Sequence, residues 1–128
     1  MNAFGQEVRT PLVIESTAIN AALTGGGATT VISKVPCIHA NSIDVFFNAS
    51  VAVTSVSLVF YVASGKLTLT QQVHAAAGAG TSHAVRWGQG LLLAAGTPNQ
   101  GQAIGQYYDV IVDTVLAGTV TVWTAARS

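Results

Sequence analysis

The sequence has few charged residues, a single cysteine and no excess of either charge. Its 128 residues include 5 Lys or Arg and 5 Asp or Glu, so the formal net charge is zero. A nucleic-acid binder that works through phosphate contacts needs a basic patch, and this balance excludes one. One cysteine excludes an intrachain disulfide framework and a zinc site built from several thiolates. Hydrophobic residues make up 50 % of the chain, which argues against disorder.

Long apolar runs and targeting signals are also lacking. The first 15 residues have no basic region followed by an apolar core, and no run approaches 18 uninterrupted apolar residues. We therefore expect neither a secretory signal nor a transmembrane helix, and no membrane partner. The length fits one domain, residues 1–128.

The scarcity of charge favours assembly with other subunits. A folded chain of 13.1 kDa exposes about 6,400 Å², so these charges leave about one per 640 Å², against about one per 200 Å² in an ordinary domain. Like-charge repulsion keeps soluble proteins apart, and this surface would provide little of it. A monomer with a neutral polar surface, solvated by Thr, Ser, Gln and Asn, is the alternative.

Alternation of apolar and polar residues predicts strands throughout the chain, and the helix-like pattern over 17–23 is too short to compete. Eight short strands with no intervening helices predict an all-β fold, an antiparallel β-sandwich that resembles a jelly roll. The apolar run 90–95 is a weaker ninth candidate. The eight expected strands lie near residues 8–16, 28–35, 42–49, 55–63, 66–74, 82–87, 106–114 and 118–125.

Two hairpins are predicted. Ser64 and Gly65 separate the strands near 55–63 and 66–74, and Gly118 closes a short loop between 106–114 and 118–125. The second hairpin would pair Val110 with Val122 and Val112 with Val120. The expected core residues are Ile43, Val45, Phe47, Val56, Leu58, Phe60, Val62, Leu67, Leu69, Val73, Tyr108, Val110, Val112, Val120 and Val122.

The opposite face of the second hairpin would carry an apolar patch of Tyr107, Ile111 and Trp123, with Asp109 across from Trp123. Such a patch predicts a subunit interface. It is also compatible with a sugar-stacking platform in which Asp109 accepts hydroxyl groups, or with a second buried side. Phe46 and Tyr61 are out of phase with the core residues of their strands and would extend the patch.

An N-terminal arm is predicted over residues 1–27. Residues 17–27 are interpreted as a loop that ends in three consecutive glycines, and this loop would serve as a hinge. The proposed anchors of the arm on a neighbouring subunit are Phe4, Leu12, Val13 and Ile14. Residues 96–106 form a long polar loop of the kind that often carries function.

Catalytic and metal-binding arrangements are not apparent. His74 and His83 could face each other across the loop 75–81, but two histidines alone rarely hold a metal. Cys37 and His39 are interpreted as a buried thiol beside a hydrogen-bonded histidine, because no third group is there to activate a thiolate. No known phosphate-binding, hydrolase or metalloprotease motif occurs. We expect no enzyme activity, cofactor or metal.

The short β-only pattern, the Ala-, Val-, Thr- and Gly-rich composition and the scarcity of charge are together similar to the small proteins that decorate and cement tailed-phage capsids. The resemblance is compositional and spans the whole chain. It implies a non-enzymatic virion protein, a trimer or other cyclic homo-oligomer that clamps neighbouring capsid subunits and is made in the host cytoplasm. Repeated contacts between rigid copies would supply the binding energy.

Two alternatives remain open. A tail, fibre or filament subunit would make head-to-tail contacts that need not close into a ring. A carbohydrate-binding module would instead use Trp123, Tyr107 and Asp109 to bind a glycan, with Trp87 beside the loop 96–106.

Overall fold

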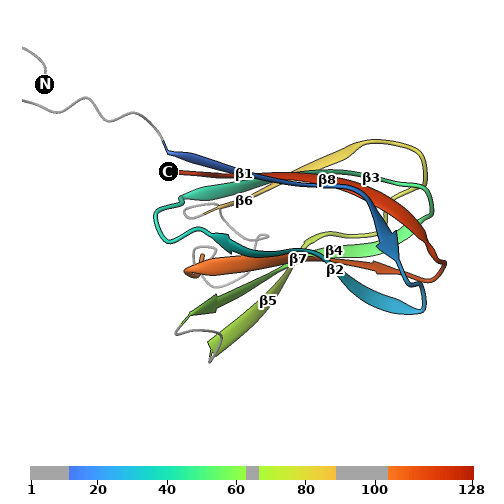
Figure 1. Ribbon diagram of the computed structural model, residues 1–128, viewed down its shortest axis with the longest axis horizontal. Coiled ribbons are helices and arrows are strands. Elements are labelled where there is room, and N and C mark those ends of the chain that lie inside the picture. The colour runs from blue at the N-terminus through green and yellow to red at the C-terminus, as the bar shows by residue number, and fades with distance from the viewer. Residues whose placement is uncertain (1–11, 63–66, 89–103) are drawn as a thin grey trace, which may run out of the picture.

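The computed structural model describes residues 12–62, 67–88 and 104–128, and it contains eight strands in two antiparallel sheets packed face to face (Figure 1). The predicted all-β antiparallel sandwich is confirmed. One sheet, the β8 sheet, has the order β1-β8-β3-β6, and the other, the β7 sheet, has the order β2-β7-β4-β5. The strands are β1 (Val13–Leu23), β2 (Gly27–Pro36), β3 (Ser42–Ala49), β4 (Val53–Val62), β5 (Leu67–His74), β6 (His83–Gly88), β7 (Tyr107–Thr114) and β8 (Gly118–Arg127).

The strand pairing is that of one long hairpin rolled around the core. β1 pairs with β8, β2 with β7, β3 with β6 and β4 with β5, all antiparallel. β4 and β5 are the only consecutive strands that lie in the same sheet among the described strands. All the other connections between consecutive strands cross to the opposite sheet. This strand order is the jelly-roll arrangement of an eight-stranded sandwich.

The predicted hairpin between β7 and β8 is wrong. β7 belongs to one sheet and β8 to the other, so Val110 and Val122 point into the core from opposite sheets and are not neighbours in one sheet. Alternation places both valines inward whether β7 and β8 form a hairpin or lie in opposite sheets. It therefore could not distinguish these two arrangements. The hairpin of β4 and β5 is confirmed by their pairing, and its turn residues lie outside the described part of the chain.

The bounds of the first strand also differ from the prediction. β1 covers residues 13–23 and pairs with β8 as far as Leu23 opposite Gly118, so most of the predicted loop 17–27 is strand. The pairing register shifts between Ala18 and Ala21, where Asn20 has a φ of +48°. This bulge breaks the alternation by which sequence analysis recognises a strand. Residues 1–11 and the candidate strand 90–95 lie outside the described residues.

Most of the predicted core is buried, whereas Leu67 and Leu69 on β5 are not. These two leucines remain 67 % and 46 % exposed, although Leu69 lies opposite the buried Phe60. β5 is an edge strand of its sheet, and Figure 1 shows it diverging from the β8 sheet, so none of the described strands covers the inward side of these leucines. Val62 and Val73 are half-buried. The confirmed core residues are Ile43, Val45, Phe47, Val56, Leu58, Phe60, Tyr108, Val110, Val112, Val120 and Val122.

Candidate assembly surfaces

The residues predicted to form one patch lie on opposite outer faces of the sandwich. Trp123 points outward from the β8 sheet, whereas Tyr107, Asp109 and Ile111 point outward from the β7 sheet, because β7 and β8 are in different sheets. The predicted single patch therefore does not exist. We name the two surfaces the Trp123 face, centred on Phe46 and Trp123, and the Tyr107 face, centred on Tyr107 and its neighbours.

On the Trp123 face, Phe46 and Trp123 are cross-strand neighbours in β3 and β8. Their ring centroids are 5.2 Å apart with an interplanar angle of 63°, an edge-to-face contact. Phe46 is 48 % exposed. The two rings thus lie side by side on the outer face of the β8 sheet.

Beside this aromatic pair lies a cluster of three charged residues. Asp44 on β3 is flanked by Arg86 on β6 and Arg127 on β8, and it is buried beneath them. Arg86 Nε donates to Asp44 Oδ1 at 2.6 Å, and Arg127 Nε donates to Asp44 Oδ2 at 2.8 Å. The hydrogen bond from Arg86, supported by Arg127, holds the pKa of Asp44 below its ordinary value despite the opposing effect of burial. The cluster joins three strands of the β8 sheet.

Replacing Asp44 with Asn should lower the free energy of unfolding by about 1 kcal/mol, because the arginine side chains are 60 % and 42 % exposed and water screens both pairs. The pKa of Asp44 is lowered in the folded state, so its contribution is complete above the ordinary value of 3.8 and is lost as pH falls through the folded-state value. Urea unfolding at several pH values should therefore show a weaker acid dependence for Asp44→Asn than for Asp113→Asn, a control on β7. Equal acid dependence in the two variants would contradict the assignment.

On the Tyr107 face, Tyr61 and Tyr107 are stacked with ring centroids 5.7 Å apart. The Tyr61 hydroxyl donates to Asp109 Oδ1 at 3.2 Å, and the Lys34 backbone N–H donates to the same oxygen at 2.9 Å. Burial, together with the Asp109 carboxylate, raises the pKa of the Tyr61 phenol. Asp109 thus ties β2 and β4 to β7, and Ile111 lies half-buried further along the same face.

The predicted sugar platform is not assembled. Trp123 lies on the opposite side of the sandwich from Tyr107 and Asp109. Trp87, the second aromatic of that hypothesis, is 7 % exposed and belongs to the core. Most of the loop 96–106 lies outside the described residues. The three side chains therefore cannot contact one sugar together.

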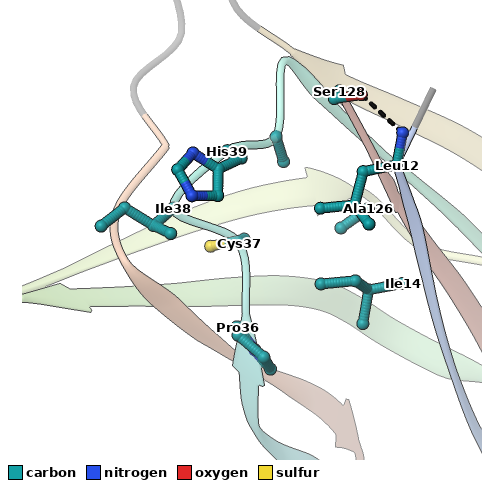
Figure 2. A pocket seen from close by; sticks show the side chains of 9 residues that line it. Leu12, Ile14, Pro36, Cys37, Ile38, His39, Ala126 and Ser128 are labelled. Atoms are coloured by element: carbon teal, nitrogen blue, oxygen red, sulfur yellow. Dashed lines mark hydrogen bonds between the residues drawn. The ribbon is translucent and has the colours of Figure 1, made fainter. Parts of the chain in front are cut away.

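Two of the four predicted anchors of the N-terminal arm line a small apolar cavity at one corner of the sandwich (Figure 2). Its volume is about 120 Å³. Leu12, just before β1, and Ile14, on β1, line it from one side, and Ile38 lines it from the β2–β3 connection. Val13 is exposed and points to the other side of β1. Phe4 lies outside the described residues. The remaining lining residues are Pro36, Cys37, His39, Ala40, Ala126 and Ser128.

Cys37 is the buried thiol that the sequence predicted, and its Sγ donates to the Gly105 carbonyl at 3.2 Å. Burial raises the pKa of the thiol to about 12, so it stays protonated at neutral pH. His39 is exposed. Cys37 therefore lacks the thiolate that a nucleophile requires.

His74 and His83 do face each other, as predicted, with ring centroids 5.4 Å apart. Both rings also contact Phe47, at 5.1 and 5.2 Å between centroids. His83 Nε2 lies 2.9 Å from the Thr81 hydroxyl, and His74 Nδ1 lies 2.7 Å from the Ala75 carbonyl oxygen. Over residues 12–62, 67–88 and 104–128, no group of three or more His, Cys, Asp or Glu is placed to hold a metal ion. The two histidine rings thus pack on the buried Phe47.

No family model and no curated protein matches the chain. Among solved structures, 99 % of the chain superposes on 36 % of a chain in the structure of infectious bursal disease virus, Gx strain, with a TM-score of 0.54 and 16 % identity. The chain shares the fold of part of a virus-particle chain. A Gt-strain chain of the same virus matches at a TM-score of 0.45 and 20 % identity, over 99 % of this chain and 34 % of its own. The protein PirA matches at a TM-score of 0.35 and 12 % identity, over 98 % and 99 %.

The present chain thus spans about a third of the length of the two virus chains. In the part of the chain that the structure describes, no helix is long and apolar enough to cross a membrane.

The cluster of Asp44, Arg86 and Arg127 was not predicted from the sequence. The three residues are 41 or more positions apart, and only the pairing of β3 with both β6 and β8 brings them together. Alternation within the strand near 42–49 did place Asp44 opposite in phase to the core residues Ile43 and Val45. This alternation indicates that Asp44 points away from the core, but it does not indicate which residues Asp44 contacts.

Proposed function

We propose that the chain is a non-enzymatic structural subunit of a viral particle, one that decorates or cements the capsid through subunit contacts. The observation that carries this proposal is the fold match over 99 % of the chain to a chain of infectious bursal disease virus. Jelly-roll sandwiches are frequent building blocks of viral capsids, although the same architecture also serves other functions.

The surface of the molecule supports the same proposal. Phe46 and Trp123 lie together on the Trp123 face, and Tyr107 and Ile111 lie on the Tyr107 face. Aromatic and arginine side chains are enriched at protein interfaces, and the Trp123 face carries both, because Arg86 and Arg127 lie beside the aromatic pair. We propose the Trp123 face as the main contact between copies in a cyclic homo-oligomer, a trimer in the simplest case. The virion is then the location of the protein.

We propose the corner cavity as a second contact. Leu12 and Ile38 are 48 % and 60 % exposed at its rim, and Ile14 lies deeper. Residues 1–11 precede Leu12, and Phe4 would serve as their apolar anchor on a neighbouring subunit. Attachment that is unchanged after deletion of residues 1–11 would overturn this part of the proposal.

Replacing Phe46 and Trp123 together with Ala should weaken self-association at least about tenfold, because it removes both aromatic rings from the centre of the proposed contact. The measurement is solution mass by light scattering over a concentration series. Val115→Ala is the matched control, because it removes an exposed apolar side chain from the β7–β8 loop, away from this face. Circular dichroism should show the same β-sheet spectrum for all variants.

The outcomes discriminate between the candidate roles. A closed oligomer in the wild type that dissociates in the double variant supports the proposal. Growth without limit as concentration rises would favour a tail, fibre or filament subunit, because such contacts do not close. A wild-type chain that remains a 13.1 kDa monomer at every concentration overturns the proposal.

A further inference from the structure

The edge strand β5 has the features of a strand that is open to a partner. It runs from Leu67 to His74 with the sequence LTLTQQVH, which contains no Lys, Arg, Asp, Glu, Pro or Gly. It pairs with β4 on one side, and among the described strands none pairs with its other side. An edge strand presents a row of backbone N–H and C=O groups that can pair with another chain, and charges, prolines and bulges are the usual means of preventing this.

The other three edges differ from β5. β1 is interrupted by the bulge at Asn20, whose φ is +48°. β2 shifts register twice against β7, and Lys34, with a φ of +57°, adds a charge to this edge. β6 has six residues, against eight in β5. The register between β5 and β4 is unbroken from Leu67 to Gln72. β5 is thus the edge most suited to pairing.

The inward side of β5 adds an apolar surface to this edge. Leu67 and Leu69 lie next to a groove of about 230 Å³ that Phe60, Val62 and Ile104 also line. The outward side carries Thr68 and Thr70, both exposed. A strand added beside β5 would therefore gain backbone hydrogen bonds and would cover exposed leucine at the same time.

We propose that β5 pairs antiparallel with β5 of a second copy of this chain, across a two-fold axis, to form one continuous eight-stranded sheet. The inference rests on the proposed function and adds a two-fold contact to the cyclic contacts given above. Two identical strands without charges can lie side by side with no like-charge repulsion, and a charged partner would find no complementary charge on this edge. The self-complementary character of the edge favours a second copy over another protein.

Two-fold symmetry restricts the register. In a continuous antiparallel sheet, residues directly opposite each other point to the same side, so a strand that pairs with itself places one residue opposite its own copy. For a strand that begins at Leu67 and ends at His74, Thr70 and Gln71 are nearest the middle, followed by Leu69 and Gln72. The axis should pass beside one of these four residues.

Thr70→Lys tests the contact, because it places two lysines near the two-fold axis on an exposed side chain that the fold does not bury. Thr30→Lys is the matched control, because it makes the same change at an exposed threonine on β2, the opposite edge of the same sheet. We expect Thr70→Lys to halve the solution mass of the assembly and Thr30→Lys to leave it unchanged. An unchanged mass in Thr70→Lys would overturn the inference.

Cysteine cross-linking gives a second readout that does not depend on oligomer stability. Disulfides need Cα atoms about 4.4–6.8 Å apart, which only residues close to the axis satisfy. Among Leu69→Cys, Thr70→Cys, Gln71→Cys and Gln72→Cys, one variant should form a covalent dimer in much higher yield than the others, and Thr30→Cys should form none. Cys37 is buried and present in every variant. Equal yields, or no dimer at any position, would overturn the pairing.

The two proposals fail in different ways. An assembly that survives Thr70→Lys and shows no cross-linking peak overturns the β5 contact and leaves the structural role standing. A monomeric wild type overturns both. An assembly that loses half its mass in Thr70→Lys, and loses the remaining contacts when Phe46 and Trp123 are replaced, supports both.

Discussion

Gly25→Ala is expected to lower the free energy of unfolding by about 3 kcal/mol or more, whereas Gly26→Ala next to it should cost about 1–2 kcal/mol. Both glycines have positive φ, +74° and +67°, in the β1–β2 turn. A Cβ on Gly25 would lie 2.6 Å from the Ala117 backbone nitrogen and 2.8 Å from the Leu116 carbonyl carbon, whereas a Cβ on Gly26 would meet no atom within 4 Å. The two variants thus share the left-handed backbone penalty, and Gly25→Ala adds a collision with backbone.

The collision matters because this turn packs on the β7–β8 loop. The Gly26 N–H donates to the Val115 carbonyl at 2.9 Å and so links the two connections that cross between the sheets at one end of the sandwich. Urea unfolding monitored by tryptophan fluorescence gives both free energies under one condition. Equal costs in the two variants would show that the loop moves aside easily, and that the close contact at Gly25 does not hold the sheets together.

The β7–β8 loop, on which these glycines pack, also shows what the sequence could not predict. Alternation along a strand reports which side chains face inward, and it correctly placed Val110, Val112, Val120 and Val122 in the core. It does not report whether two consecutive strands lie side by side or face each other. Residues 115–117 contain neither the Asn-Gly nor the Asp-Gly pair typical of a tight hairpin, and the chain there crosses to the other sheet.

The same limit accounts for the candidate surfaces. Trp123, Tyr107 and Phe46 were correctly placed outside the core, because their phase along each strand fixes that choice. Their grouping depended on the assumed hairpin, and it changed when β7 and β8 were placed in different sheets. The contact of Phe46 with Trp123 depends on the pairing of β3 with β8, two strands that are distant in sequence. Local pattern thus predicted exposure, and only the topology determined which residues share a face.

The exposed leucines of β5 illustrate a related limit. The pattern of Leu67 and Leu69 indicates an inward side, and their opposition to Val62 and Phe60 confirms the direction in which they point. A side chain that points inward becomes buried only if another strand covers it, and the β8 sheet does not extend over this edge. An inward-facing residue on an edge strand can therefore remain accessible, which is the property that the proposed β5 contact uses.

A hydrogen bond across the core should contribute about 1 kcal/mol to the free energy of unfolding. The Tyr108 hydroxyl on β7 lies 2.8 Å from the Thr124 hydroxyl on β8, and both side chains are fully buried between the sheets. Burial raises the pKa of Tyr108 to about 12, so its phenol is neutral at physiological pH and serves only as a hydrogen-bonding group. This contact joins the two strands that the sequence had paired incorrectly.

The two partners should not be equally costly to replace. In Tyr108→Phe, the Thr124 hydroxyl can still donate to the Ser16 carbonyl, 3.5 Å away, so we expect a loss of about 1 kcal/mol. In Thr124→Val, the Tyr108 hydroxyl is left buried without this partner, and the loss should be about 2 kcal/mol. The double variant should cost less than the sum, because replacing both partners with apolar groups leaves no buried hydroxyl unsatisfied.

Tyr61→Phe is the matched control, because it removes a tyrosine hydroxyl whose hydrogen bond to Asp109 lies on an outer face, and it should cost no more than about 0.5 kcal/mol. A double-mutant cycle by urea unfolding measures the coupling between Tyr108 and Thr124, and additive losses would contradict a bond that bridges the sheets. Since neither residue reaches the surface, the folded variants should assemble as the wild type does. Loss of assembly in a folded Thr124→Val variant would instead show that the spacing of the two sheets, and not the outer side chains alone, determines the subunit contacts.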